Sequence, residues 1–415
     1  MRTVGLITEY NPFHNGHLHH LRESRRAADA EVAVAVMSGH FLQRGEPALV
    51  DKWVRAEMAL RAGVDVVIEL PFPFACNSAP HFARGAVEAL EALGAVDALC
   101  FGSEAGEIEP LRRCADLLLE REAEVAAGTA ALLRAGVNYP AARAQVLAEL
   151  DGGMAEQQLA APNNILGIEY LKALRQTGSA LQPLTIRRIG AGYHDGCARG
   201  GIASATGIRR MLAAGEDVVP FIPAPAREVF FQAAAEGRLL DPERLFPLLA
   251  AAVLRSPDAL KDLYLVGDGL ERRLAEAARS ACSLESLVDA VKSRHFTRTR
   301  IQRILCYVLT GALREEMDAF LESGPLYLRL LAASEKGRAF LAAARKTRSL
   351  PVLDNLSRVH SVLKRHYGAG SPRHQLAEMM LDIDLRATAL YTLLVENWPG
   401  GDRNRDFFTG VIGPR

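Results

Sequence analysis

The residues with the clearest chemical potential lie close to the amino terminus, in the segment Glu9-Tyr10-Asn11-Pro12-Phe13-His14-Asn15-Gly16-His17. Gly16 allows a ligand to approach the backbone at a predicted helix start, where free N–H groups and the helix dipole attract phosphate. His14 and His17 are three residues apart, so both can face one site from a single turn. We predict that their imidazolium N–H groups stabilise negative charge on phosphate oxygens as pyrophosphate leaves. A zinc pair is the weaker interpretation, because the sequence shows no third ligand in a companion motif.

A second segment, Ile202-Ala203-Ser204-Ala205-Thr206-Gly207-Ile208-Arg209, lies where another helix is predicted to begin. Its hydroxyl groups, the free helix end and the arginine predict a second grip on phosphate. Arg187-Arg188 closes a late predicted strand, and Gly102 follows an earlier one. Asn163 follows Pro162 and is predicted to be a helix N-cap. A Walker A loop and a GxGxxG fingerprint are both absent from the sequence.

These motifs lie between apolar runs that alternate with helix-like segments. Strands are predicted at residues 3–8, 31–37, 64–70, 96–101 and 184–189, with helices between them. Strands that are apolar on both faces indicate a parallel sheet covered by helices. We therefore predict an α/β fold with a Rossmann-like doubly wound sheet, whose ligands bind at the carboxyl ends of the strands.

The predicted domain organisation changes near residue 220. Residues 1–220 would form the nucleotide-binding domain, with a helical insertion at about 107–160, and residues 221–415 a mainly helical domain. Two basic segments in the second half suit a polyanion such as nucleic acid, although solvated helix faces would show the same composition. The first contains Lys292, Arg294, Arg298, Arg300 and Arg303, and the second contains Lys336, Arg338, Arg345, Lys346, Arg348, Arg358, Lys364, Arg365 and Arg373.

Composition excludes some classes of protein. The 415 residues contain 49 Lys+Arg and 49 Asp+Glu, so net charge alone predicts no partner. No run of about 18 apolar residues occurs, and the first residues lack the apolar core of a signal peptide, so we expect no membrane association. The six cysteines form no C-x-x-C pair, and we expect reduced, mostly buried thiols in a cytoplasmic protein.

The His-x-Gly-His turn followed by a later Ser/Thr-x-x-Arg helix resembles the nucleotidylyltransferase superfamily related to class I aminoacyl-tRNA synthetases. More narrowly, the chain resembles the bacterial tRNA(Met) cytidine acetate ligase family. The resemblance spans Gly5 to about Leu305, in GLITEYNPFHNGHLHHL, MSGHFLQRGEPALVDKWVRAEMAL, ELPFPFACNSAPHFARGAV, CFGSE, PNNILGIEYLKAL, RRIGAGYHD, IASATGIRRML and HFTRTRIQRIL. One departure is Ala205, where relatives of the wider superfamily often carry a second hydroxyl.

The resemblance implies a set of ATP-binding residues, with His14 and His17 catalytic and Asn163 preferred over Asn164. The implied set is Ile7, Thr8, Glu9, Tyr10, Asn11, Pro12, Phe13, His14, Asn15, Gly16, His17, Leu18, His19, His20, Gly102, Asn163, Arg187 and Arg188. No protein ligand set for a metal is implied. Mg²⁺ is expected to accompany ATP, held largely by phosphates and water.

The implied activity joins acetate to ATP, giving acetyl-adenylate and pyrophosphate. The acetyl group then passes to N4 of the wobble cytidine of elongator tRNA(Met), and the product is N4-acetylcytidine. Two alternatives remain at this point. A small-molecule adenylyltransferase would use the same histidine pair without a basic helical domain, and a non-catalytic RNA-binding protein would keep only a relict of the nucleotide fold.

Overall fold

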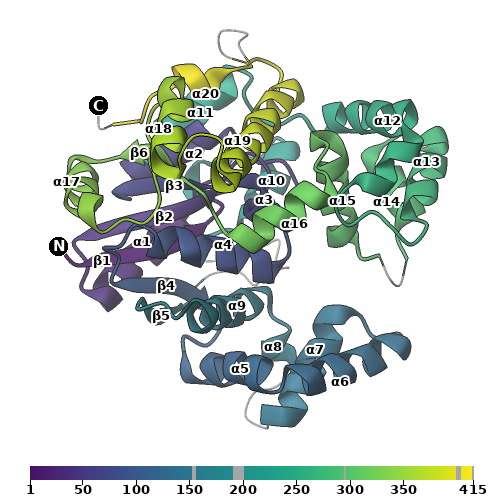
Figure 1. Cartoon of the computed structure of the whole chain (residues 1–415), viewed down its shortest axis with the longest axis horizontal. Helices are drawn as coiled ribbons and strands as arrows, with labels where there is room; N and C mark the ends of the chain where they lie inside the picture. Colours follow the sequence, from purple (N-terminus) through teal and green to yellow (C-terminus); the bar gives the residue numbers. More distant parts are fainter. Residues whose placement is uncertain (152–155, 190–200, 294–295, 399–402, 414–415) are drawn as a thin grey trace.

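A single seven-stranded sheet forms the centre of the computed structural model, which describes residues 1–151, 156–189, 201–293, 296–398 and 403–413 (Figure 1). The strand order is β5-β4-β1-β2-β3-β6-β7. The first five strands in this order are parallel, β6 is antiparallel to β3, and β7 is parallel to β6. The strands are β1 (Thr3–Thr8), β2 (Val32–Ser38), β3 (Val66–Leu70), β4 (Ala98–Ser103), β5 (Gln182–Arg187), β6 (Leu328–Ala333) and β7 (Val352–Leu353).

Both faces of the sheet are buried along its inner strands, as the continuous apolar runs predicted, whereas the edge strand β5 is partly exposed. Strand β2 is buried at every position, and its valines pack into one helical layer while its alanines pack into the other. One layer contains α1 (Asn15–Ala28), α2 (Lys52–Arg61), α10 (Ala205–Ala213) and α11 (Ala224–Ala235). The other contains α3 (Phe72–Ala75), α4 (Ala79–Glu91), α9 (Pro162–Thr177) and α17 (Glu335–Ala343). The predicted doubly wound α/β fold is therefore confirmed.

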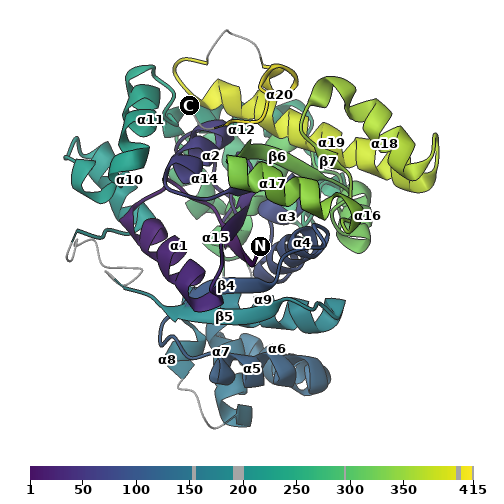
Figure 2. The ribbon, with the colours of Figure 1, turned by 90° about the vertical axis from the view of Figure 1, so that its left-hand side faces the viewer.

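The predicted helical insertion forms an arm that projects from the sheet beside β4 and β5 (Figure 2). It consists of α5 (Glu109–Glu120), α6 (Glu122–Arg134), α7 (Tyr139–Asp151) and α8 (Glu156–Leu159). Buried residues of α5, including Leu111 and Cys114, belong to the same apolar core as Ile168 and Leu171 of α9. The arm is thus attached to the sheet through α9, and its α6–α7 end is free to face other parts of the molecule.

Helices dominate the second half of the chain, but they do not account for all of it. They are α12 (Leu245–Arg255), α13 (Leu270–Ser280), α14 (Leu284–Val291), α15 (Arg298–Thr310), α16 (Arg314–Ser323), α18 (Val359–Tyr367), α19 (Pro372–Tyr391) and α20 (Arg405–Phe408). The sequence did not predict β6 or β7, yet both extend the sheet of the first half. The six residues of β6 are all buried and include only one charged residue, Arg329, and periodicity alone cannot separate such a short strand from a buried helical turn.

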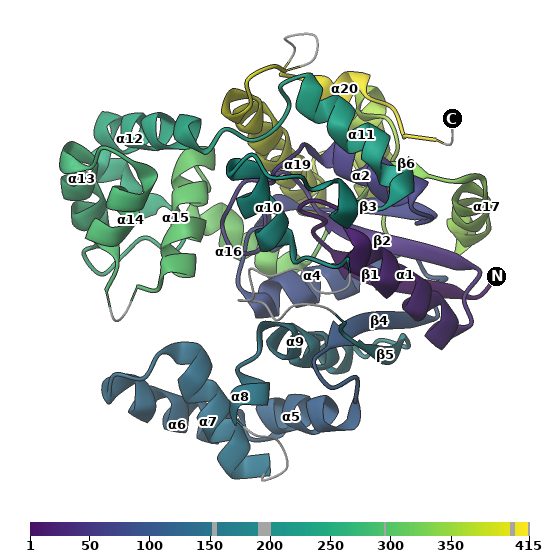
Figure 3. The same cartoon turned by 180° about the vertical axis from the view of Figure 1, so that it is seen from behind.

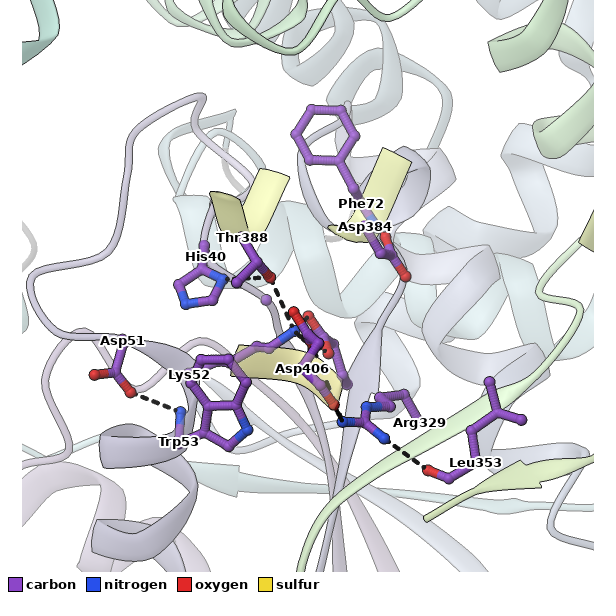
Figure 4. Close-up of polar contacts among 12 residues, drawn as sticks. His40, Asp51, Lys52, Trp53, Phe72, Arg329, Leu353, Asp384, Thr388 and Asp406 are labelled. Atoms are coloured by element: carbon purple, nitrogen blue, oxygen red, sulfur yellow. Dashed lines mark hydrogen bonds and ion pairs between the residues drawn. The ribbon is translucent and has the colours of Figure 1, made fainter. Parts of the chain in front are cut away.

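A buried ionic cluster ties the end of the chain to the sheet (Figure 4). Lys52 Nζ of α2 lies 2.8 Å from Glu69 Oε2 of β3, 2.8 Å from Asp406 Oδ1 of α20 and 3.2 Å from Thr388 Oγ1 of α19. Burial alone would lower the pKa of Lys52, but Asp406 and Glu69 outweigh it and raise that pKa. Because Asp406 lies 337 positions beyond Glu69, this contact holds residues far apart in sequence in one core.

Nearby, Asp384 of α19 accepts a hydrogen bond from Phe72 N at 2.7 Å and another from the Tyr327 hydroxyl at 2.6 Å. Burial, followed by the charge of Glu69, raises the pKa of Asp384 to about 8. This carboxyl is therefore neutral over most of the physiological pH range.

The sheet opens at its carboxyl edge between β1 and β4. Strand β1 pairs with β2 at six positions, but with β4 only at Val4 and Gly5. Beyond Gly5 the two strands no longer pair, and the strand order also reverses direction here, which is where doubly wound sheets bind ligands. The Glu9–His17 segment emerges directly from the end of β1 into this opening.

Two other expectations concern the chain as a whole. Among the described residues, Cys76, Cys100, Cys114 and Cys306 are free and buried, and Cys282 is free and exposed. None of the described helices is both long and apolar enough to cross a bilayer.

Candidate active site

His14 and His17 form a reciprocal cap at the start of α1. His14 is the N-cap residue, and its Nδ1 accepts the N–H of Gly16 at 3.0 Å. The Nδ1 of His17 in turn accepts the N–H of His14 at 3.3 Å, and the ring centroids are 3.8 Å apart. This is the geometry of a capping box, in which imidazoles replace the usual Ser and Glu side chains. The three-residue spacing thus brings both rings to one place, as predicted.

The cap determines the protonation state of both rings. An Nδ1 that accepts a hydrogen bond carries no proton, so each neutral imidazole presents Nε2–H as its donor. Burial, with the charges of Arg188 and Arg209, lowers the pKa of His14 to about 3. Burial and neighbouring histidines also lower the pKa of His17 well below its ordinary value. The prediction of imidazolium donors is therefore wrong for the ligand-free protein, and the donors are neutral Nε2–H groups.

The backbone of this turn is also occupied. The N–H of Gly16 binds His14 Nδ1, and those of His17 and Leu18 bind the His14 carbonyl. These N–H groups are therefore already bonded within the turn, which leaves the imidazole Nε2–H groups as its candidate donors to a phosphate. Gly16 has an additional reason to lack a side chain, since a Cβ there would lie 2.8 Å from His14 Cε1.

A cavity of about 1580 Å³ opens above the carboxyl edge of the sheet. The predicted residues that line it are Ile7, Thr8, Glu9, Tyr10, Asn11, His14, Gly16, His17, His19, His20, Gly102, Asn163, Arg187 and Arg188. Four predicted residues are not among those that line it: Pro12, Phe13, Asn15 and Leu18. Phe13 is fully buried in the core, and the Asn15 amide donates to the carbonyls of Gly201 and Pro220. These two residues support the turn instead of facing the cavity.

Asn163 and Asn164 have different surroundings. The half-buried Asn163 amide donates to Glu104 Oε1 at 2.8 Å and accepts from Arg188 NH1 at 2.8 Å. The buried Asn164 accepts the N–H of Glu104 and donates to the carbonyl of Gln158. Asn163 is the one that lines the cavity, which favours it as the ligand contact. It is not the predicted N-cap, because Ala161 occupies that position and no side chain caps the helix.

The second segment predicted to bind phosphate, at the start of α10, uses some of its polar groups for contacts within the protein. Ser204 caps α10 by accepting the N–H of Gly207 at 3.0 Å. Arg209 donates to the carbonyl of Asn11 at 3.0 Å and to Glu46 Oε1 at 3.1 Å. Ser204, Thr206 and Arg209 all line the cavity, so α10 brings its amino-terminal end to the site as expected. Arg209 also fixes the turn after β1 against the loop after β2.

Comparisons with known proteins bear on this arrangement. The sequence profile of a family described as HIGH nucleotidyl transferase matches residues 1–406. A protein named tRNA(Met) cytidine acetate ligase from Syntrophotalea carbinolica is 62% identical over 414 residues, which cover 99% of both chains. One of the same name from Alkaliphilus metalliredigens is 40% identical, covering 96% of this chain and 95% of its own length.

This chain belongs to the tRNA(Met) cytidine acetate ligase family. A crystal structure of Thermotoga maritima TmcAL bound with alpha-thio ATP superimposes on it with a TM-score of 0.90 and 35% identity, covering 100% of this chain and 99% of that one. The apo form of the same protein gives a TM-score of 0.92 and 36% identity with the same coverage. The resemblance found in the sequence between Gly5 and about Leu305 is thereby confirmed, and the similarity also extends over the rest of the chain.

Sequence reasoning missed the loop after β2, although its position at a carboxyl strand end was a usable signal. Gln43, Arg44 and Glu46 of this loop line the cavity. The N–H of Gln43 donates to Glu9 Oε1 at 2.7 Å. Burial raises the pKa of Glu9, and Glu46 adds to the shift, while the Gln43 N–H opposes it. In this tRNA(Met) cytidine acetate ligase family member, the loop therefore holds one carboxylate of the histidine turn in place.

The first basic segment contacts this loop. Arg303 of α15 is half-buried, and its Nε donates to the carbonyl of Gln43 at 2.7 Å. Arg298 instead pairs with Glu285 on the surface. Arg300 and Arg303 line the cavity, whereas Arg298 does not. Arg303 therefore braces the site, and the expectation that this basic segment binds nucleic acid stays a prediction; Arg294 and the GAGYHD stretch lie outside the described residues.

The second basic segment lies elsewhere. Its nine residues are on α17, α18, the turns between them and the start of α19, and none of them is among the residues that line the cavity. Figures 1 and 3 show α17 at the opposite end of the molecule from α15. Its role as an RNA surface stays a prediction.

Proposed function

We propose that this protein activates acetate with ATP and transfers the acetyl group to N4 of the wobble cytidine of elongator tRNA(Met). The observation that carries the proposal is the pair of neutral, pre-oriented imidazoles in a cavity at the sheet's switch point, within a chain 62% identical to a protein named tRNA(Met) cytidine acetate ligase. Since tRNA is its proposed substrate, we also propose that the protein acts in the cytoplasm.

In the first step, an acetate oxygen would attack the α-phosphorus of ATP as the bond to the pyrophosphate oxygen breaks. Nε2–H donors from His14 and His17 would bind the phosphate oxygens on which negative charge increases. Such donors need no proton exchange with solvent, because the cap already fixes their tautomer. The remaining contribution is positioning, since in-line displacement at phosphorus depends on alignment.

Nucleotide contacts are proposed for Gly102, Asn163, Arg187 and Arg188, which line the same cavity. A Cβ at position 102 would lie 3.0 Å from the Arg188 side chain, so the glycine leaves room for this arginine. Mg²⁺ would neutralise phosphate charge while phosphates and water supply most of its ligands. Glu9 lines the cavity and is the carboxylate of the histidine turn that would contribute a ligand to this Mg²⁺.

In the second step, N4 of cytosine would attack the carbonyl carbon of acetyl-adenylate, AMP would leave, and the amine would lose a proton. A wobble base is already unpaired in an anticodon loop, so exposing it costs little. No side chain of the protein needs to be acetylated in either step.

The decisive experiment incubates the protein with tRNA, ATP, Mg²⁺ and isotopically labelled acetate, followed by mass spectrometry of the digested nucleosides. We expect labelled N4-acetylcytidine that depends on all four components. Acetate-dependent ATP–pyrophosphate exchange in the absence of tRNA tests the first step separately. No exchange with acetate, together with AMP transfer to a phosphorylated metabolite, would instead identify a small-molecule adenylyltransferase.

A further inference from the structure

The cavity is larger than a nucleotide site requires. A pocket for one small ligand has a volume of roughly 300–1,000 Å³, and this cavity has about 1580 Å³. Its wall includes elements far from the histidine turn, namely the end of the α6–α7 pair and the start of α15. Figures 1 and 3 show these two elements on opposite sides of the space beside the sheet.

The end of the α6–α7 pair presents large apolar side chains to this space. Tyr139 is 53% exposed and Leu133 is 38% exposed, and both line the cavity. Within the described residues, the Tyr139 side chain makes no hydrogen bond and its ring contacts no other aromatic ring. An aromatic side chain left open to solvent in a cavity wall, with no internal partner there, is suited to a ligand that stacks on it.

The facing wall carries a second planar group. The guanidinium of Arg300 lies over the ring of Phe296, with 5.0 Å between its carbon and the ring centroid. Phe296 is buried, and this contact holds the Arg300 guanidinium at the cavity wall. Unpaired bases in RNA stack on aromatic rings and on arginine planes of this kind.

The charge of the wall indicates what kind of ligand carries those bases. Among the described residues, eight arginines line the cavity: Arg44, Arg134, Arg143, Arg187, Arg188, Arg209, Arg300 and Arg303. Only three carboxylates line it, namely Glu9, Glu46 and Asp268. A positive wall with exposed planar groups is the combination that binds single-stranded nucleic acid, through its phosphates and the faces of its bases.

We propose that Tyr139 and the Arg300–Phe296 pair form a stacking site for the unpaired bases that flank the target cytidine. The inference rests on the proposed function and specifies how its RNA substrate is held. It assigns the helical insertion, rather than only the carboxyl-terminal half, to RNA recognition. The arm would then close the cavity around a loop whose bases are already unpaired.

The test compares Tyr139→Ala, Tyr139→Phe and Arg300→Lys in the full-length protein. The control is Phe408→Ala, because Phe408 is 74% exposed and is not among the residues that line the cavity. The probe is an RNA stem-loop that carries the target cytidine in its loop. Affinity is measured across a salt series, alongside tRNA-independent pyrophosphate exchange and acetylcytidine formation.

We expect Tyr139→Ala to weaken stem-loop binding on the order of 10-fold with an unchanged salt slope, because a stacking contact is lost and no phosphate contact is. Tyr139→Phe and the control should bind like the parent, and exchange should be unaffected. Arg300→Lys keeps the charge but not the plane, so it should also bind more weakly.

Parental affinity in Tyr139→Ala, or an equal loss in Tyr139→Phe or in the control, would overturn the stacking site. A fall in exchange would place Tyr139 against the adenine of ATP and overturn it as well. The proposed function fails separately, if the parent protein itself forms no acetylcytidine.

Discussion

The histidine turn and the Lys52 cluster both bury ionisable groups, but they handle them in opposite ways. In the turn, the groups are neutral, each ring uses one nitrogen for the backbone, and the rings line an open cavity. In the cluster, Lys52 is paired with both Glu69 and Asp406, and its side chain is 1% exposed. Burial of ionisable groups therefore does not by itself indicate a functional site. Of these two regions, only the turn presents its polar groups to space that a ligand can occupy.

The largest effect is expected from breaking the cluster. Lys52→Met would leave Glu69 and Asp406 buried without their shared cation, so we expect a loss of about 3–5 kcal/mol of unfolding free energy. Urea denaturation measures it. The exposed Lys336→Met is the matched control and should change stability by less than about 0.5 kcal/mol. A loss below about 1 kcal/mol for Lys52→Met would show that the cluster is not an important structural contact.

Substitutions in the histidine turn should lower catalytic activity and not stability. His14→Ala should lower the rate of acetate-dependent pyrophosphate exchange by about 10²–10³, because one donor to a developing oxyanion is lost. His14→Asn is the control, since asparagine can replace the N-cap but not the Nε2–H donor. If the asparagine variant recovered parental exchange, the cap and not the donor would be the function of His14.

The pH profile sharpens the same contrast. Since the pKa of His14 is lowered to about 3, this ring is neutral above about pH 4 in the ligand-free enzyme. The kcat/KM of the parent protein for pyrophosphate exchange should therefore show no inflection near pH 6.5 that is due to His14. The pH profile of His14→Asn should have the same shape in this range. An inflection there that disappears in the variant would restore the imidazolium interpretation.

Arg303 combines features of the two regions, because it makes an internal structural contact and also lines the cavity. Arg303→Ala removes the donor to the Gln43 carbonyl, and Gln43 holds Glu9. We expect pyrophosphate exchange to fall on the order of 10-fold through mispositioning. Arg298→Ala, which breaks only a surface pair with Glu285, should leave exchange within about twofold. Equal effects of the two variants would argue against a specific brace.

The smallest effect is expected at the edge of the cluster. Because the pKa of Asp384 is raised to about 8, the folded protein keeps a proton that the unfolded chain releases near pH 4. The stability associated with this carboxyl is complete below about pH 4 and is lost as the pH rises to about 8. Asp384→Asn should flatten the dependence of the melting temperature on pH between 5 and 8. An unchanged dependence would contradict a neutral Asp384.

The sequence by itself determined the parallel sheet, the histidine turn after β1 and the family. These follow from local pattern: apolar runs of strand length, helical spacing between them, and two histidines three residues apart. It also favoured Asn163, whose position beside Arg188 the structure supports.

The chemical state of His14 and His17 depends on the tertiary structure. The histidines are neutral because their Nδ1 atoms accept backbone hydrogen bonds and because of burial. Neither feature can be inferred from the spacing of the two residues in the sequence. Three features join residues that lie more than 250 positions apart: the pairing of β6 with β3, the contact from Arg303 to Gln43, and the Lys52 cluster. The pattern of β6 is also ambiguous when the strand is considered alone. Such contacts depend on how distant segments pack, and a local pattern contains no information about that packing.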